Sequence, residues 1–251
     1  MIAPGDSRSG SRPPGAVVAA STAEPVGVAE PVVKSTVARA EVSSLVCVRP
    51  VCSNARAMNT NSPSQKVLLR REAMRRRAEA HLRLAEAAGK LVQSHGLALL
   101  DGNPGRIVSG YLPIRDELTP LPLMLALLKA GRTLALPVIV TKWAPLTFRS
   151  WQPADPLVPA AFGLREPLPA APEVLPDVLL VPLAAFDAEG YRIGYGGGYY
   201  DRTLALYRSQ RSVTAVGIAH DEQEVPVFAH EPHDQRLDYL ITPSGVRTFG
   251  P

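Results

Sequence analysis

The chain is poor in cysteine and in long hydrophobic segments. Its two cysteines, Cys47 and Cys52, lie in the N-terminal quarter, so the rest of the chain has none for a disulfide framework or a cysteine zinc site. No run approaches the roughly 18 apolar residues of a membrane helix. With 46% hydrophobic and 20% charged residues, the composition is typical of a soluble chain with a core. We therefore expect a protein that does not span a membrane and that lies in a reducing compartment such as the cytoplasm.

Residues 1–62 differ in composition from the rest. The stretch SRSGSRPPGAVVAASTAEPVGVAEPVV mixes Ser, Gly, Pro, Ala and Val without helical or strand periodicity, and it contains no aromatic residue. Such a composition is typical of a flexible segment. We expect residues 1–62 to be either a disordered extension or the product of a mispredicted start upstream of Met58, and residues 63–251 to form one folded domain.

The folded region opens with a basic helical pattern. Apolar residues recur at the spacing of one helical face from Leu69 to Leu91, and Gly96 is expected to end the helix. On its other faces Lys and Arg outnumber Glu, and the whole chain carries a formal charge of +4. A solvated amphipathic helix and an anion-binding face both fit this pattern.

Strands and helices then alternate. The pattern predicts helices over 117–131 and 199–210, a proline-rich crossing over 153–176, and strands over 106–113, 133–140, 145–151, 177–186, 213–220 and 237–242. Such alternation favours an α/β three-layer domain with a mainly parallel sheet flanked by helices. Ligands of such sheets, here a nucleotide, bind beyond the carboxyl ends of the strands.

The glycine-rich stretch GYGGGYYDR, residues 194–202, follows the most apolar predicted strand and precedes a helix. That layout directs backbone N–H groups and a helix N-terminus at phosphate. It matches neither standard nucleotide signature, because Tyr199 replaces the third glycine of G-x-G-x-x-G and no Gly-Lys-Ser/Thr follows. Arg192 is placed to balance phosphate charge. Asp201 fits two roles equally: a ligand of a hard cation, with Asp234 or Asp238 as a second carboxylate, or a first-turn helix residue that interacts with the macrodipole.

Several segments together resemble the 5-formyltetrahydrofolate cyclo-ligase family, also called methenyltetrahydrofolate synthetase. The resemblance covers almost all of residues 63–251, and its most specific motif is FDAEGYRIGYGGGYYDR. The other matching segments are KVLLRREAMRRR, VSGYLPIRDELTPLPLM, LALPVI, FGLREP, GIAHDEQ and HEPHDQRLDYLIT. The resemblance implies an ATP- and Mg²⁺-dependent enzyme that converts 5-formyltetrahydrofolate to 5,10-methenyltetrahydrofolate, ADP and phosphate. We also expect a monomer with no nucleic-acid or membrane partner.

The family's sites can be carried over by matching segment. The resemblance implies ATP binding by Lys66, Arg70, Arg192, Gly194, Tyr195, Gly196, Gly197, Gly198, Tyr199, Tyr200, Asp201 and Arg202. Within that set, Lys66 and Arg192 would stabilise charge in the reaction. Mg²⁺ would be held by Asp201 and Asp234, and the folate by Tyr111, Glu117, Phe162 and Tyr200.

Two departures from the family pattern bear on these sites. Phe162 stands where some relatives have tryptophan, and Tyr195 and Gly197 stand where some carry arginine and lysine. Fewer cations then touch the phosphates directly. The reaction needs no side-chain nucleophile, which agrees with the absence of cysteine from the folded region.

Two alternatives stay open at this point. One is an ATP-dependent kinase of another small metabolite. The other is a basic RNA-binding protein, although residues 66–94 contain no Phe, Tyr or Trp of the kind that RNA-binding elements interleave with basic residues.

Overall fold

The computed structural model describes residues 63–102 and 105–250. The expectations for residues 1–62 lie outside these ranges. No helix among the described residues is long and apolar enough to cross a membrane.

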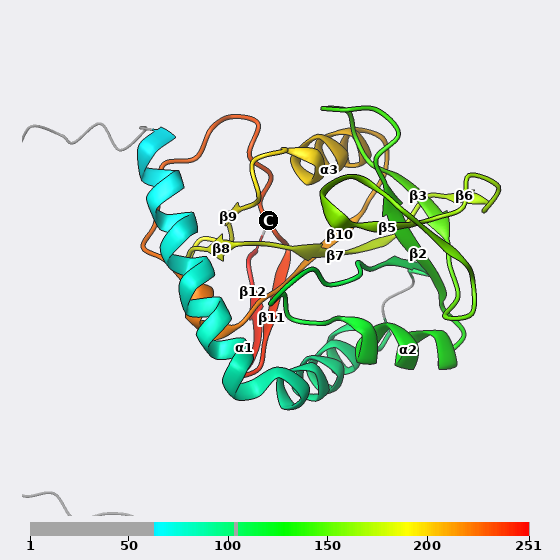
Figure 1. Ribbon diagram of the computed structural model, residues 1–251, viewed down its shortest axis with the longest axis horizontal. Coiled ribbons are helices and arrows are strands. Elements are labelled where there is room, and N and C mark those ends of the chain that lie inside the picture. The colour runs from blue at the N-terminus through cyan, green and yellow to red at the C-terminus, as the bar shows by residue number, and fades with distance from the viewer. Residues whose placement is uncertain (1–62, 103–104, 251) are drawn as a thin grey trace, which may run out of the picture. The chain divides into compact units, whose positions relative to one another are not determined.

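The central feature is a mixed sheet in the order β12-β11-β10-β7-β1-β2-β3-β6 (Figure 1). Its middle strands, from β11 to β2, pair in parallel, while β12, β3 and β6 add antiparallel edges. The strands are β1 (Ile107–Ser109), β2 (Thr133–Val138), β3 (Thr147–Ser150), β6 (Glu173–Val174), β7 (Val178–Pro182), β10 (Thr214–Ile218), β11 (Tyr239–Thr242) and β12 (Gly245–Thr248). The predicted α/β class with a mainly parallel sheet is confirmed.

Helices cover both faces of this sheet (Figure 1). The helices are α1 (Pro63–Leu100), α2 (Leu121–Lys129) and α3 (Tyr199–Gln210). Successive residues of β7 point to opposite faces, as a strand requires. Val178 and Leu180 pack in the cluster that includes α1 and α2, whereas Leu179 and Val181 pack with α3. Every one of these four side chains is buried, which explains the continuous apolar run.

The first helix is longer than predicted, because Gly96 does not end it and the helix runs on to Leu100. The glycine has a packing role there instead. A Cβ at this position would lie 2.4 Å from Leu123 Cδ2 in α2. Gly96 therefore lets two helices approach closely. In the sequence, a glycine required for close packing looks the same as a glycine that ends a helix.

Short pairings in the chain crossings were not predicted. The proline-rich crossing contains a hairpin of β4 (Leu157–Pro159) and β5 (Arg165–Pro167), with the short helix η1 (Ala161–Gly163) between its strands. The predicted strand 177–186 ends at Pro182 as β7, and its remainder forms β8 (Ala185–Phe186), which pairs with β9 (Arg192–Ile193). The β8–β9 hairpin delivers the chain directly into the glycine loop.

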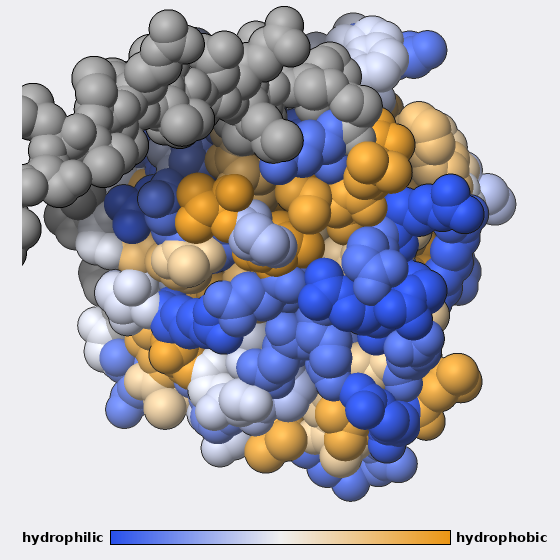
Figure 2. Space-filling view, turned by 90° about the vertical axis from the view of Figure 1, so that its left-hand side faces the viewer, coloured by the Kyte–Doolittle hydropathy of each residue, from blue (hydrophilic) through white to orange (hydrophobic). Residues whose placement is uncertain are grey.

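The outer surface of α1 belongs to the face shown in Figure 2, where hydrophilic residues form broad areas with hydrophobic patches between them. Exposed ion pairs form within the helix, including Arg75 with Glu72 and Lys90 with Glu86. Arg77 is different, since only 1% of it is exposed. The helix thus combines a solvated charged face with one arginine directed into the domain.

Candidate functional site

The glycine loop, residues 194–198, joins β9 to α3 and keeps its backbone accessible. Gly196 has φ 95°, and Gly198 caps α3 in the left-handed region at φ 61°. A Cβ at Gly194 or Gly196 would meet no atom within 4 Å. The N–H groups of 196–198 donate no hydrogen bond to another described residue. The loop therefore offers free donors at a helix N-terminus, the arrangement that binds phosphate.

Three arginines surround this loop and hold its shape. Arg70 Nε donates to Gly194 O at 2.8 Å, and Arg202 Nη2 donates to Gly197 O. Arg192 is 8% exposed, and its Nη2 donates to Asp201 Oδ1 at 2.9 Å. All three therefore lie beside the glycine loop, and part of their donor capacity is used to fix the loop and its flanking carboxylate.

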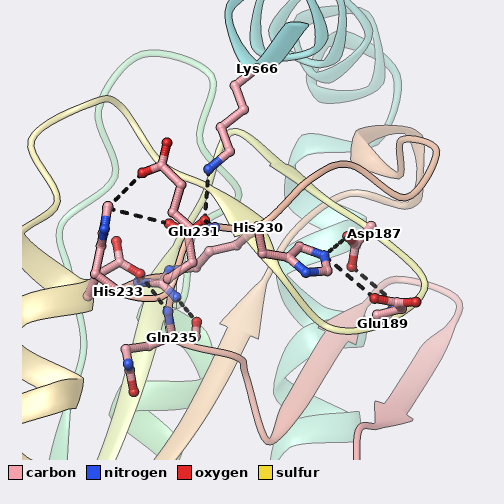
Figure 3. Close-up of polar contacts among 10 residues, drawn as sticks. Lys66, Asp187, Glu189, His230, Glu231, His233 and Gln235 are labelled. Atoms are coloured by element: carbon pink, nitrogen blue, oxygen red, sulfur yellow. Dashed lines mark hydrogen bonds and ion pairs between the residues drawn. The ribbon is translucent and has the colours of Figure 1, made fainter. Parts of the chain in front are cut away.

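Lys66 and Asp234 meet beside the loop, although they are 168 positions apart. Lys66 Nζ donates to Asp234 Oδ2 at 2.7 Å (Figure 3). Burial would raise the pKa of Asp234, but the Glu231 N–H and the Lys66 ammonium outweigh it and lower that pKa. Arg192 is close enough for both Asp201 and Asp234 to raise its pKa, although burial lowers it overall. The predicted phosphate and metal groups are thus gathered around one side of the glycine loop.

The donor set of the two carboxylates fits a hard cation. Asp201 uses Oδ1 for Arg192 and for the N–H of Gln235, and Asp234 uses Oδ2 for Lys66 and the N–H of Glu231. No hydrogen bond to a described residue engages Asp201 Oδ2 or Asp234 Oδ1. Asp201 Oδ2 is thus open to an ion such as Mg²⁺, and Asp234 Oδ1 has His233 Nε2 at 4.0 Å. Mg²⁺ binds through one or two carboxylates plus phosphate oxygens.

The segment that carries Asp234 is tied to the β8–β9 turn. His230 Nε2 lies 3.3 Å from Asp187 Oδ2 and 3.5 Å from Glu189 Oε2 (Figure 3). Asp187 Oδ1 accepts the N–H groups of Glu189 and Tyr191, and the His230 ring stacks on Tyr191 with centroids 3.5 Å apart. These contacts fix the loop near Asp234 relative to the strand that leads to the glycine loop.

A cavity of about 520 Å³ opens on the glycine loop. It brings together the predicted residues Tyr111, Glu117, Phe162, Arg192 and 194–201. Lys66, Arg70, Arg202 and Asp234 are not among its lining residues. Apolar side chains supply much of the remaining wall, namely Met74, Leu112, Ile114, Pro137, Ile139, Leu146, Leu164 and Pro182.

Glu117 is the buried carboxylate of this cavity. It is 5% exposed, it accepts the Ile114 N–H at 2.9 Å, and it accepts the Tyr195 hydroxyl. Burial raises the pKa of Glu117 above its ordinary value, against the opposing effect of the Tyr195 hydrogen bond. Arg77 also donates to the Tyr195 hydroxyl and binds Asp116 through two nitrogens, at 2.9 and 3.1 Å. Although predicted with the phosphate loop, Tyr195 therefore also joins Glu117 to a buried arginine.

Two further tyrosines complete the polar part of the cavity. Tyr111 is 5% exposed and donates its hydroxyl to Leu118 O at 2.8 Å. The buried hydroxyl of Tyr200 has no hydrogen-bond partner among the described residues. An unpaired buried hydroxyl is costly, so Tyr200 is placed to bond a ligand that enters the cavity.

Several residues of the cavity were not predicted as site residues. Arg77 belongs to the basic helix and is one of several arginines there. Arg115 lies in the matching segment VSGYLPIRDELTPLPLM but was given no role, and Lys142 and Trp143 lie in a loop without a sequence motif. The adjacent "KW" in a segment with few other aromatic residues was the available signal for two of them. Asp238, considered as a second metal carboxylate, binds Arg208 at 3.0 Å and the Ala215 N–H instead.

Comparison with known proteins identifies the family. Residues 62–243 match the model of the 5-formyltetrahydrofolate cyclo-ligase family. The chain belongs to this family.

Named members of this family are similar to this chain over more than half of its length. A 5-formyltetrahydrofolate cyclo-ligase of Mycolicibacterium smegmatis is 36% identical over 55% of this chain and 74% of its own. The one of Escherichia coli is 39% identical over 55% of this chain and 79% of its own. The solution structure of 5,10-methenyltetrahydrofolate synthetase from Aquifex aeolicus is 31% identical, with a TM-score of 0.60 over 73% of this chain and 92% of its own.

Proposed function

We propose that this cyclo-ligase family member converts 5-formyltetrahydrofolate to 5,10-methenyltetrahydrofolate, with Mg²⁺ and with cleavage of ATP to ADP and phosphate. The observation that carries the proposal is that one cavity is lined both by the glycine loop, with its free N–H groups, and by the buried Glu117 and by Tyr200, whose hydroxyl is buried. Two different substrates can therefore meet across residues 194–200. The names of the relatives support the same reaction.

ATP binds with its phosphates on the glycine loop in this proposal. Backbone donors of 196–198 face the phosphate oxygens, while Lys66 and Arg192 supply positive charge from the two flanks. Lys66 exchanges its contact with Asp234 for a phosphate contact. That exchange leaves Asp234 free to join Asp201 as an oxygen ligand.

The folate occupies the cavity on the other side of the loop. Glu117 accepts hydrogen bonds from the amide or amine edge of the pterin, and the unpaired Tyr200 hydroxyl donates to an oxygen of the substrate. The exposed ring of Phe162 offers a flat apolar surface. Tyr111 supports the wall through its bond to Leu118 O.

The chemistry then requires alignment more than reactive side chains. The formyl oxygen of the folate attacks the terminal phosphorus of ATP, the bond from that phosphorus to ADP breaks, and a formyl-phosphate-like imidate forms whose carbon stays bonded to the folate nitrogen. The neighbouring folate nitrogen attacks the formyl carbon and loses its proton, and the carbon–oxygen bond breaks to release phosphate. Alignment of two bound substrates is worth ~7–11 kcal/mol, enough for a large share of the acceleration.

Mg²⁺, held by Asp201 and Asp234, would neutralise charge on the phosphate oxygens. The residues of the chain do the rest. Lys66 and Arg192 stabilise negative charge on the transferring group.

The proposal also covers the setting of the enzyme. We propose residues 63–251 as the catalytic domain, a monomer that acts in the cytoplasm on ATP and a reduced folate, without nucleic acid or membrane partners. Residues 1–62 have no part in the proposed reaction.

Release of ADP by the full chain tests this function. With Mg-ATP present, ADP is expected only after addition of 5-formyltetrahydrofolate, in one-to-one ratio with the folate product. ADP release that needs no folate would favour a kinase of another metabolite and refute the proposal. Retention on RNA that weakens steeply with salt would favour the RNA-binding alternative.

A further inference from the structure

Three strained residues surround one cavity. Among residues 63–102 and 105–250, the non-glycine residues with positive φ are Arg115 at 55°, Trp143 at 64° and Phe162 at 62°. All three line the cavity, although they come from separate loops after β1, after β2 and between β4 and β5. Bulky residues rarely adopt this backbone region, and where they do the strain often serves a site.

Trp143 is held in an exposed position by this backbone. The residue is 56% exposed, and its ring lies parallel to Tyr199, at 4°, with centroids 6.4 Å apart. Lys142 Nζ lies 5.3 Å from the same ring, and the Arg202 guanidinium 6.0 Å from it. The indole thus has a parallel tyrosine ring and two cations over its face, while more than half of the residue stays exposed.

Positive charge without a carboxylate partner lines the same cavity. Arg115 and Lys142 both line the cavity and are exposed, and neither forms an ion pair with a carboxylate among the described residues. By contrast, the cavity arginines Arg77 and Arg192 each bind an aspartate. Lys66, predicted to bind phosphate, is not a lining residue. The free charge of the cavity thus belongs to the loops that carry the strained residues.

On the basis of the proposed function, we propose that Trp143, Lys142 and Arg115 recognise the p-aminobenzoyl-glutamate arm of the folate substrate. Trp143 packs against the benzoyl ring, and the two cations bind glutamate carboxylates. A folate consists of a pterin, a second flat ring and an anionic end. Glu117 and Tyr200 suit the pterin, so the exposed indole and cations match the part of the substrate that remains.

Tryptophan fluorescence gives a direct test with the full chain and p-aminobenzoyl-glutamate as the probe. The chain has two tryptophans, and Trp151 is only 5% exposed, so a surface ligand should perturb Trp143 alone. Saturable quenching is expected for the natural chain and should disappear in Trp143→Phe. An equal change in both proteins, or none in a protein that turns over 5-formyltetrahydrofolate, would overturn the inference.

Kinetics separate recognition from stability. Trp143→Gly removes the ring and relieves the positive φ, so the KM for 5-formyltetrahydrofolate should rise about tenfold, with no loss of Tm and no change in the KM for ATP. Val140→Ala is the matched control, because Val140 is 62% exposed in the same loop and does not line the cavity. An altered KM for ATP alone would contradict the assignment.

Charge reversal tests the two cations. Arg115→Glu and Lys142→Glu should each raise the Kd for p-aminobenzoyl-glutamate about fivefold, as expected for exposed ion pairs. Arg165→Glu should leave it unchanged, because Arg165 is exposed on β5 outside the cavity. Equal effects of all three changes, or none, would refute the proposal. Absence of turnover by the natural enzyme would refute the proposed function instead, since the binding titration does not require turnover.

Discussion

Lys66 Nζ lies 2.7 Å from Asp234 Oδ2 and so joins the first turn of α1 to the loop that precedes β11. Each residue comes from a segment that the sequence assigned to phosphate or metal binding. Their pairing keeps a cation and a carboxylate side by side. In the proposed function, this contact gives way when ATP and Mg²⁺ bind.

Substitution of Lys66 should weaken ATP binding selectively. In Lys66→Ala we expect the KM for ATP to rise about 10- to 100-fold, because a hydrogen bond to a charged group is worth about 1.5–3 kcal/mol. The KM for the folate should change little. Lys90→Ala is the control, since Lys90 lies on the same helix and pairs with Glu86 on its exposed surface. Steady-state kinetics with each substrate varied in turn measure the effect, and equal KM values for ATP in both variants would contradict it.

Asp201→Asn should impair both metal binding and folding. The substitution leaves Arg192 buried without its anionic partner, so the free energy of unfolding should fall by about 1–3 kcal/mol. The Mg²⁺ concentration for half-maximal activity should also rise at least about tenfold. Denaturant unfolding and Mg²⁺ titration measure the two effects.

Asp238→Asn separates the effect on folding from the effect on Mg²⁺ binding. Like Asp201, Asp238 pairs with an arginine, here Arg208 of α3, but it does not line the cavity. The substitution should lower stability without changing the Mg²⁺ requirement. A shared shift of the Mg²⁺ dependence would show that the change at Asp201 acts through folding alone.

Glu117 should make stability depend on pH. Burial raises its pKa in the folded state above the ordinary value of about 4.3, so the folded state holds the proton more tightly than the unfolded state. The free energy of unfolding therefore falls as pH rises from the ordinary pKa through the raised one. Glu117→Gln should lack this fall and should be about 10- to 100-fold less active, because it loses a charged acceptor. Parallel stability curves from acid to neutral pH would contradict the buried-carboxylate account.

Gly190 should tolerate no side chain. It has φ 88°, and a Cβ there would lie 2.5 Å from the Phe249 ring. Gly190→Ala should lower the free energy of unfolding by about 2–4 kcal/mol, from backbone strain and overpacking together. Gly131→Ala isolates the backbone part, since Gly131 has φ 83° and nothing lies within 4 Å of its Cβ position. It should cost about 1 kcal/mol, and equal losses in the two variants would contradict the packing part.

The sequence predicts the central layers of this fold because β7 and α3 carry strong local patterns. It fails where long-range packing decides. Gly96 lies inside α1, where its missing side chain leaves room for Leu123 of α2. The β8–β9 hairpin depends on pairing between two short segments, one of which lies at the end of an apolar run that reads as a single strand. Neither contact can be inferred from the local helix or strand propensities of the residues.

The candidate site shows the same division. The glycine loop and its flanking Arg192 and Asp201 are continuous in sequence, so one motif reveals them. Arg77 and Trp143 are recognisable only once the fold brings α1 and the β2–β3 loop to the cavity. The burial of one arginine among many, and the left-handed backbone of Trp143, leave no sequence pattern.

The most direct test of the account follows the near-ultraviolet absorbance band of 5,10-methenyltetrahydrofolate. The full chain is mixed with 5-formyltetrahydrofolate and Mg-ATP, and the band should grow only when ATP and Mg²⁺ are both present. Growth should be lost in Asp201→Asn at Mg²⁺ concentrations that saturate the natural chain. A folded protein that binds ATP and 5-formyltetrahydrofolate but forms no band would contradict the proposed reaction.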